Sequence, residues 1–247
     1  IYAVGDGVLH YDGSTWVREY DGPRGVAAVW GPSPDEVFAA ASGGVALHRT
    51  RTGWTEHSTG IQLPLNAIHG SGPHDVFVVA NAGKIAHYDG EHWEQQSSGT
   101  RAFLNGVYVA APNDAVAVGD GGVILHYDGS RWTAQPSGTT DSLTQVWGTS
   151  GDDIHALGYE HLLHYDGRTW SPVPGIPESG LQHVRGMVRT PTGIEFVGGL
   201  GTSARLESGE WSRSESGTTL SLERIWRSES GTTIAVGECG AILCRAP

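Results

Sequence analysis

The most constraining feature of the sequence is an internal repeat with a period of about 39 residues. Each copy closes on a tryptophan, and these follow one another at spacings of 38, 39, 39, 38 and 41 residues: Trp16, Trp54, Trp93, Trp132, Trp170 and Trp211. A second shared phrase precedes each tryptophan, is clearest at 115–122, and recurs at 233–240 as a seventh copy. A period of this length is typical of folds built from stacked supersecondary units.

Within one period, four short β-forming runs alternate with turns. In the copy at 143–174 we expect strands at 143–147, 154–157, 162–165 and 169–172. Asp166-Gly167 stands between the last two runs, and Asp-Gly is a strong hairpin signal because both central residues can adopt positive φ. No apolar pattern with helical spacing extends over ten or more positions. Four strands per repeat predict an all-β fold, a β-propeller of four-stranded antiparallel blades.

The repeat copies also bear on the number of blades. We treat residues 1–247 as a single β-propeller domain, with approximate repeat units at 1–25, 26–64, 65–103, 104–142, 143–180, 181–221 and 222–247. Seven copies of the second and third strands are present, but only six clear copies of the first and of the fourth. Seven blades, two of them incomplete, use every copy, so we favour seven. Six complete blades with two strands left over are the alternative.

Composition excludes several classes of function. The longest apolar runs fall short of 18 residues, so we expect no membrane insertion. The net charge is −12, Lys84 is the one lysine, and the arginines are scattered, so we expect no nucleic-acid partner. Because the chain begins with Ile1 inside a repeat and its one methionine is Met187, we expect a processed product or a domain of a longer chain.

The segment 11–16 (YDGSTW) resembles the Asp-box, or bacterial neuraminidase repeat, with one residue fewer between Asp12 and Trp16 and with His10 in place of the usual Ser or Thr. The wider pattern at 117–129 is similar to propellers of the photosystem II assembly factor type and to secreted or lipid-anchored repeat proteins of myxobacteria. The resemblance spans the chain and implies a bacterial propeller outside the cytoplasm, either extracellular, periplasmic or at the cell surface. It implies no chemistry, because Asp-boxes form turns and a fold does not specify an activity.

Residues that repeat in every copy are first interpreted as structural. This applies to the third-strand histidines and the turn aspartates: His10, His48, His87, His126, His164, Asp12, Asp89, Asp128 and Asp166. One such residue per blade cannot supply the several ligands that zinc or calcium needs, so we expect no metal and no cofactor. The closing tryptophans and the first-strand position of Trp30, His69, Tyr108, Trp147, Arg185 and Trp226 are expected to pack between blades.

Enzymatic activity is the weakest of three hypotheses. A glycoside hydrolase or lyase is considered because sialidases also contain Asp-boxes, but Arg24, Arg185 and Arg224 lie in different repeat units and no Arg-Ile-Pro motif is present. No nucleophile elbow or phosphate-binding loop occurs. Cys239 and Cys244 lie too far apart along a hairpin for a disulfide. We therefore assign no catalytic residue and expect a protein that is not an enzyme.

Function is expected on loops where the copies differ, at the rim that carries the segments entering first strands and the turns joining second and third strands. The candidate ligand-binding residues there are Asn66, Asn105, Thr144, Gln145, Gln182, His183, Glu223, Arg224, Tyr159, Glu160 and His161. The favoured hypothesis is a non-catalytic binding or scaffold propeller that recognises a protein partner on this rim. The alternative is a carbohydrate-binding lectin, since amides and aromatic rings also suit glycans.

Overall fold

The computed structural model describes residues 1–22, 25–177, 180–181, 183–228 and 230–245. These residues form seven antiparallel sheets, of which the first and last have three strands and the others four. The fold is an all-β propeller with seven blades, as expected, and the six-blade alternative is wrong. Within the described ranges, no helix is long and apolar enough to cross a membrane.

The first four sheets use their strands in sequence order. Their strands are β1 (Tyr2–Val4), β2 (Val8–Tyr11), β3 (Trp16–Tyr20); β4 (Val26–Ser33), β5 (Glu36–Ala41), β6 (Val45–Thr50), β7 (Gly53–Ser58); β8 (Leu65–Gly72), β9 (Asp75–Ala80), β10 (Lys84–Tyr88), β11 (Trp93–Ser97); and β12 (Leu104–Ala111), β13 (Asp114–Gly119), β14 (Ile124–Tyr127), β15 (Trp132–Gln135).

The last three sheets follow the same order. Their strands are β16 (Leu143–Ser150), β17 (Asp153–Gly158), β18 (Leu162–Tyr165), β19 (Trp170–Pro172); β20 (Val184–Thr190), β21 (Gly193–Gly198), β22 (Thr202–Glu207), β23 (Glu210–Glu215); and β24 (Leu222–Arg227), β25 (Thr233–Gly237), β26 (Ile242–Arg245). The first strand of the fifth sheet is longer than expected, because β16 continues to Ser150 and the hairpin turn shrinks to Gly151-Asp152.

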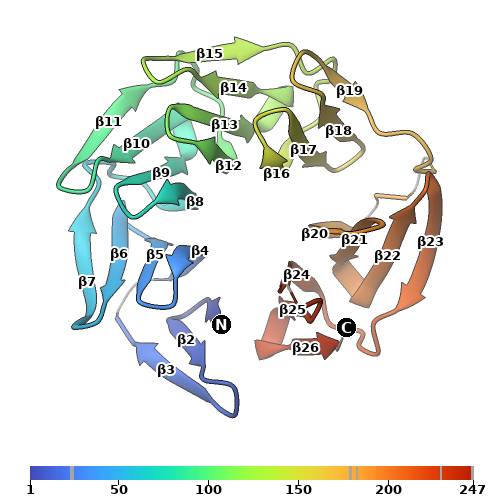
Figure 1. The fold of residues 1–247 in the computed structure, drawn as a ribbon, viewed down its shortest axis with the longest axis horizontal. Coiled ribbons are helices and arrows are strands. Elements are labelled where there is room, and N and C mark those ends of the chain that lie inside the picture. The colour runs from blue at the N-terminus through green and yellow to red at the C-terminus, as the bar shows by residue number, and fades with distance from the viewer. Residues whose placement is uncertain (23–24, 178–179, 182, 229, 246–247) are drawn as a thin grey trace. The chain divides into compact units, whose positions relative to one another are not determined.

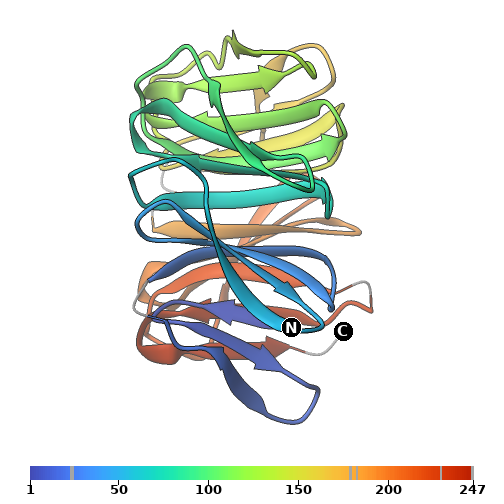
Figure 2. The same ribbon diagram turned by 90° about the vertical axis from the view of Figure 1, so that its left-hand side faces the viewer.

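The chain divides into two compact units, residues 1–155 with 165–170 and residues 156–164 with 171–247, and the division runs through the fifth sheet. In the first unit, β4, β8, β12 and β16 contact one another in succession, while β7, β11 and β15 lie at the opposite edges of their sheets (Figure 1). The blue to green sheets of this unit stack face to face (Figure 2). In the second unit, β20 contacts β24.

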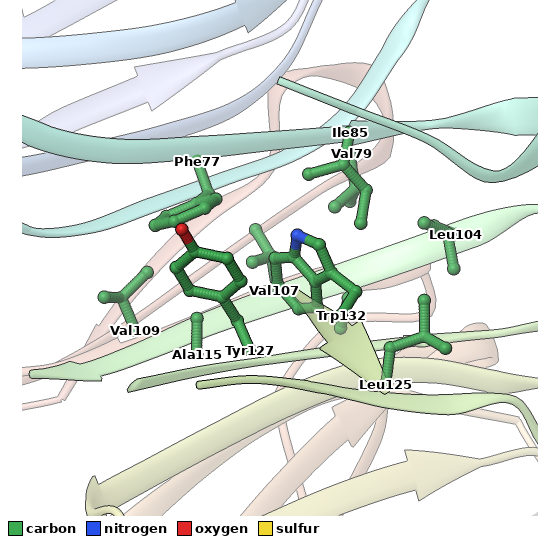
Figure 3. Packing of buried hydrophobic residues seen from close by; sticks show 11 residues of the cluster. Phe77, Val79, Ile85, Leu104, Val107, Val109, Ala115, Leu125, Tyr127 and Trp132 are labelled. Atoms are coloured by element: carbon green, nitrogen blue, oxygen red, sulfur yellow. The ribbon is translucent and has the colours of Figure 1, made fainter. Parts of the chain in front are cut away.

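Stacked sheets bury apolar side chains from both sides. One such cluster fills the space between the third and fourth sheets and contains Phe77, Leu125, Tyr127 and Trp132 (Figure 3). Trp132 is 7% exposed, its ring meets that of Phe77 edge-on at 5.7 Å, and its Nε1 donates to Oε1 of Gln96 on the preceding sheet at 2.7 Å. The expected packing of this tryptophan between blades is confirmed.

Two other closing tryptophans make the same hydrogen bond to the preceding sheet. Trp170 donates to Gln135 at 2.7 Å and Trp54 to Glu19 at 3.2 Å. An indole N–H that enters an interface between blades thus finds an acceptor three residues beyond the previous copy's tryptophan. In these three copies the tryptophan therefore both fills the interface and bonds the preceding sheet.

The Asp-Gly turns are confirmed as hydrogen-bonding devices, but their conformation differs from the expected one. In each, only the glycine has positive φ, from 87° to 107°, and the aspartate Oδ1 accepts the backbone N–H groups two and three residues later. At Asp128, bonds from the Ser130 hydroxyl and N–H and from the Arg131 N–H lower the pKa to about 2. The loop therefore has four residues, and the aspartate closes it with its side chain.

The third-strand histidines bond carboxylates within their own sheets. The pairs are His10–Glu19 at 2.9 Å, His48–Glu36 at 2.8 Å, His87–Asp75 at 2.7 Å and His126–Asp114 at 2.9 Å. In the sixth sheet Arg205 takes this position and contacts the buried Glu195 at 3.0 Å, and Arg245 of the seventh sheet contacts the same carboxylate. The structural interpretation of the repeated histidines is confirmed for these four. Cys239 and Cys244 are unbridged, as expected.

The first-strand aromatic position links neighbouring blades of the first unit. The His69 ring lies 5.4 Å from that of Trp30 and 5.1 Å from that of Tyr108, and its Nδ1 accepts the Val109 N–H at 3.1 Å. Burial lowers the pKa of His69 to about 4, so the ring is neutral at pH 7 and Nδ1 can accept. One imidazole thus connects three sheets.

Trp132→Ala is expected to lower the free energy of unfolding by about 3–5 kcal/mol, because it opens a cavity between two blades and leaves Gln96 without its donor. Urea denaturation measures the change. Phe103→Ala is the matched control, since that ring is 49% exposed and its loss should leave the midpoint nearly unchanged. A Trp132→Ala protein as stable as the wild type would contradict the interpretation of this residue as a wedge.

His69 is expected to make folding sensitive to mild acid. Its pKa is lower in the folded chain than the ordinary value of about 6.5, so its contribution is fully present above that value and is lost as pH falls from about 6.5 to 4, by up to about 3 kcal/mol. Denaturation midpoints of the wild type and His69→Gln, measured at pH 7.5, 6, 5 and 4, test this. The wild type should lose more stability over this range than the variant, and equal slopes would refute the assignment.

Candidate functional site

The segments that enter first strands are hydrogen-bonded to the turns that join second and third strands. These turns are η1 (Asn81–Gly83), η2 (Asp120–Gly122), η3 (Gly199–Gly201) and η4 (Glu238–Gly240). The bonds are Gly83 N–H to Ala102 O (2.7 Å), Asp120 N–H to Phe103 O (2.9 Å), Gly199 N–H to His183 O (2.7 Å) and Glu238 N–H to Ser221 O (2.9 Å). We call these loops, within each unit, the loop rim.

Two candidate amides of the first unit connect blades. Asn66 Nδ2 donates to Asn81 Oδ1 and to the carbonyl of Leu104 on the next sheet, both at 2.8 Å. Asn105 Nδ2 repeats the arrangement one blade on, donating to Asp120 Oδ1 at 2.9 Å and to Leu143 O at 3.0 Å. Both N–H groups of each amide are therefore already used, and a ligand could reach only the amide oxygens.

Thr144 and Gln145 follow Leu143 on β16 and are half-buried. Gly106 faces this strand, and a β-carbon at Gly106 would lie 3.3 Å from the Cα of Gln145. The two inner strands approach closely because this glycine carries no side chain. Asn66, Asn105, Thr144 and Gln145 thus lie on three successive first strands, at the same end of each.

In the second unit, the equivalent position holds a charged pair. Arg185 Nη1 donates to Oε1 of Glu223 on the next sheet at 2.9 Å, and Arg224 Nη1 donates to the carbonyls of Glu223 at 2.8 Å and Arg185 at 3.3 Å. The candidates Glu223 and Arg224 are therefore both hydrogen-bonded to neighbouring groups of this unit, Glu223 through Arg185.

The register of β20 corrects the sequence alignment of the sixth copy. Val188 is paired with Glu195 as His69 is with Phe77, so Val188, and not Arg185, occupies the aromatic position. Arg185 instead follows the anchor Val184 as Asn66 follows Leu65. The rim position that the sequence alignment assigned to Gln182, directly after the anchor, is therefore occupied by Arg185. Gln182 and Arg24 themselves lie outside the described residues.

The remaining candidates of the second unit are in its turns. Tyr159 is 63% exposed in the turn Tyr159-Glu160-His161, which the bond from Gly158 N–H to His161 O closes at 2.7 Å. His183 and Leu200 have φ values of 71° and 56° in the left-handed region, and Leu200 is 74% exposed. A branched side chain in that region is strained, and the sister turn has Gly121 in the place of Leu200.

The structure also shows rim residues that sequence reasoning passed over. Phe103 is 49% exposed beside η2, and an open groove of about 700 Å³, lined by 121–125 and 134–140, begins one residue from Asp120. The signal was present, because Phe103 stands where sister copies have Pro64, Ser142 and Ser221. A comparison of the copies at the residue before each anchor would have identified it.

No protein-family model matches the sequence, and no curated protein matches it. Solved structures do match. YCF48 from Cyanidioschyzon merolae is similar with a TM-score of 0.75 at 18% identity, covering 100% of this chain and 91% of that chain. YCF48 bound to D1 peptide gives 0.73 at 15%, covering 100% and 87%. The WD40 β-propeller domain of Doa1 gives 0.83 at 10%, covering 98% and 87%. At such identities the likeness shows the fold alone, a propeller.

Asn105→Ala is expected to lower stability by about 1–3 kcal/mol, because it leaves the carbonyl of Leu143 and the carboxylate of Asp120 without their shared donor between two blades. The urea midpoint measures the loss. Glu94→Ala, an exposed change on β11, is the control and should have little effect. An unchanged midpoint for Asn105→Ala would show that the amide is free to serve a ligand instead.

Proposed function

We propose that this chain is a non-catalytic protein-binding propeller whose loop rim contacts an extended segment of a partner protein. The observation that carries the proposal is the placement of exposed apolar side chains. In the described part of the chain, four of the seven large apolar side chains that are exposed lie in segments that enter first strands or in turns that join second and third strands: Phe103 in the first unit, and Tyr159, Leu200 and Leu220 in the second. Binding residues concentrate on loops, and exposed apolar side chains there are typical of interaction surfaces.

Two further points support a protein partner. The propeller of similar fold named above was solved with a bound peptide. On the rim, the polar candidates with the best geometry for a ligand, Asn66 and Asn105, donate both amide hydrogens within the protein. The available rim is therefore more apolar than the sequence suggests, which favours a peptide over a glycan. Its location outside the cytoplasm remains part of this proposal, and rests on the resemblance to secreted repeat proteins.

A random 12-residue peptide library displayed on phage, panned against the immobilised chain, tests the proposal, with a glycan array run in parallel. We expect selected peptides that bind the purified chain in solution with micromolar dissociation constants and lose affinity when Phe103 or Leu200 is changed to Asp. Binding of glycans without any peptide would favour the lectin alternative. Failure of every peptide to bind would refute the proposed function.

A further inference from the structure

Three residues of the first unit depart from the repeat at a single place on the loop rim. Phe103 stands where sister copies have Gly25, Pro64, Ser142, His183 and Ser221. Lys84 stands where other copies have Val45, Val123, Thr202 and Ala241, and Arg101 where they have Gln62, Thr140 and Thr219. Each blade needs its repeated residues to pack, so the departures mark positions that the fold does not dictate. We call Lys84, Arg101 and Phe103 the basic–aromatic patch.

Backbone hydrogen bonds bring the three residues together. The Gly83 N–H donates to the carbonyl of Ala102 at 2.7 Å, so Lys84 and Arg101 each lie next in sequence to one partner of the same bond. The carbonyl of Phe103 accepts the Asp120 N–H at 2.9 Å, which fixes the segment between η1 and η2. Arg101 and Phe103 are exposed and Ala102 between them is half-buried, so the two side chains face solvent from one anchored loop.

The two cations have no carboxylate partners within the described residues. Elsewhere in the chain, Arg49, Arg185 and Arg205 each contact a carboxylate at 2.7 to 3.0 Å. The adjoining turn η2 carries one acid, Asp120, and its Oδ1 already accepts from Asn105. An acidic chain with a net charge of −12 thus keeps two unneutralised cations beside an exposed aromatic ring.

We infer that the partner of this propeller supplies an acidic segment with an aromatic or large aliphatic side chain, and that this segment binds the basic–aromatic patch. The inference rests on the proposed function and specifies its site and ligand chemistry. The apolar side chain packs on Phe103 while flanking carboxylates pair with Lys84 and Arg101. Aromatic and arginine side chains are the groups that contribute most to protein interfaces, and complementary charge fixes orientation.

The groove beside η2 gives such a segment room to continue. It begins at Gly121, where no heavy atom would lie within 4 Å of an added β-carbon, and it extends along β14 and β15 to Thr140. Its walls are glycines, hydroxyl side chains, apolar residues and the amide of Gln135, with no acidic group among them. An acidic peptide that leaves Phe103 in this direction passes Asp120, whose Oδ1 accepts from Asn105, and then follows a wall without carboxylates.

The test uses a fluorescently labelled peptide of sequence Gly-Asp-Glu-Phe-Asp-Glu-Gly amide, titrated with the purified chain by fluorescence polarisation. Two matched peptides accompany it, one with Lys and Arg in place of the acids and one with Gly in place of Phe. We expect the acidic, Phe-containing peptide to bind and each matched peptide to bind at least about tenfold more weakly.

Two variants of the chain locate the site. Lys84→Glu with Arg101→Glu should weaken binding of the acidic peptide at least about tenfold, and Phe103→Ala about three- to tenfold. The control, Arg18→Glu with Arg51→Glu, makes the same change in net charge at exposed positions away from the patch and should bind as the wild type does. Thermal melting of every variant confirms that the fold persists.

The outcomes separate this inference from the proposed function. Equal binding by the wild type and both patch variants would overturn the inference, as would equal binding of the basic peptide. The acidic peptide could fail to bind while library-selected peptides bind the wild type and the patch variants with equal affinity. In that case the inference is wrong and the proposed function stands. If no peptide of any kind binds, the proposed function fails and the inference fails with it.

Discussion

Everything in this fold depends on the need of a four-stranded sheet to cover both of its faces. A single blade has too little apolar surface to form a core alone, so its stability comes from the sheet stacked on it. The closing tryptophans answer this need directly: Trp132 fills the interface with its ring and donates its N–H to Gln96 of the neighbouring sheet. On the first strands, the neutral ring of His69 packs between Trp30 and Tyr108, and its Nδ1 accepts the N–H of Val109 on the next sheet.

The same requirement explains why polarity alone is a poor guide to the binding site. Inner strands of adjacent blades lie close together, and their ends expose carbonyl groups that need donors. Asn66 and Asn105 supply those donors, which is why they recur one period apart. A residue that recurs in every repeat is therefore expected to stabilise the contact between neighbouring blades. Residues that break the pattern and are exposed on the rim, such as Lys84 and Phe103, are better candidates for a partner.

The strands, the seven copies and the structural histidines could be predicted because each depends on a residue type at a fixed spacing. The sixth copy could not be aligned, because Leu181 and Val184 are both buried and either could serve as the anchor of the first strand. Only the pairing of Val188 with Glu195 decides between them. The departure of Phe103 from its sister copies is visible in the sequence, but its position beside η2 is not, since local sequence does not show which turn lies beside a loop.

Charge gives the basic–aromatic patch its selectivity. A net charge of −12 repels an acidic segment from most of the surface, and at 0.1 M salt that repulsion extends only about 10 Å. Within this distance, an acidic segment is attracted by cations that are not paired with carboxylates. Repulsion by the acidic surface elsewhere disfavours binding of the segment at other positions. The acidic background therefore does not conflict with an acidic ligand. It favours binding at the part of the described rim where Lys84 and Arg101 lie beside an exposed ring.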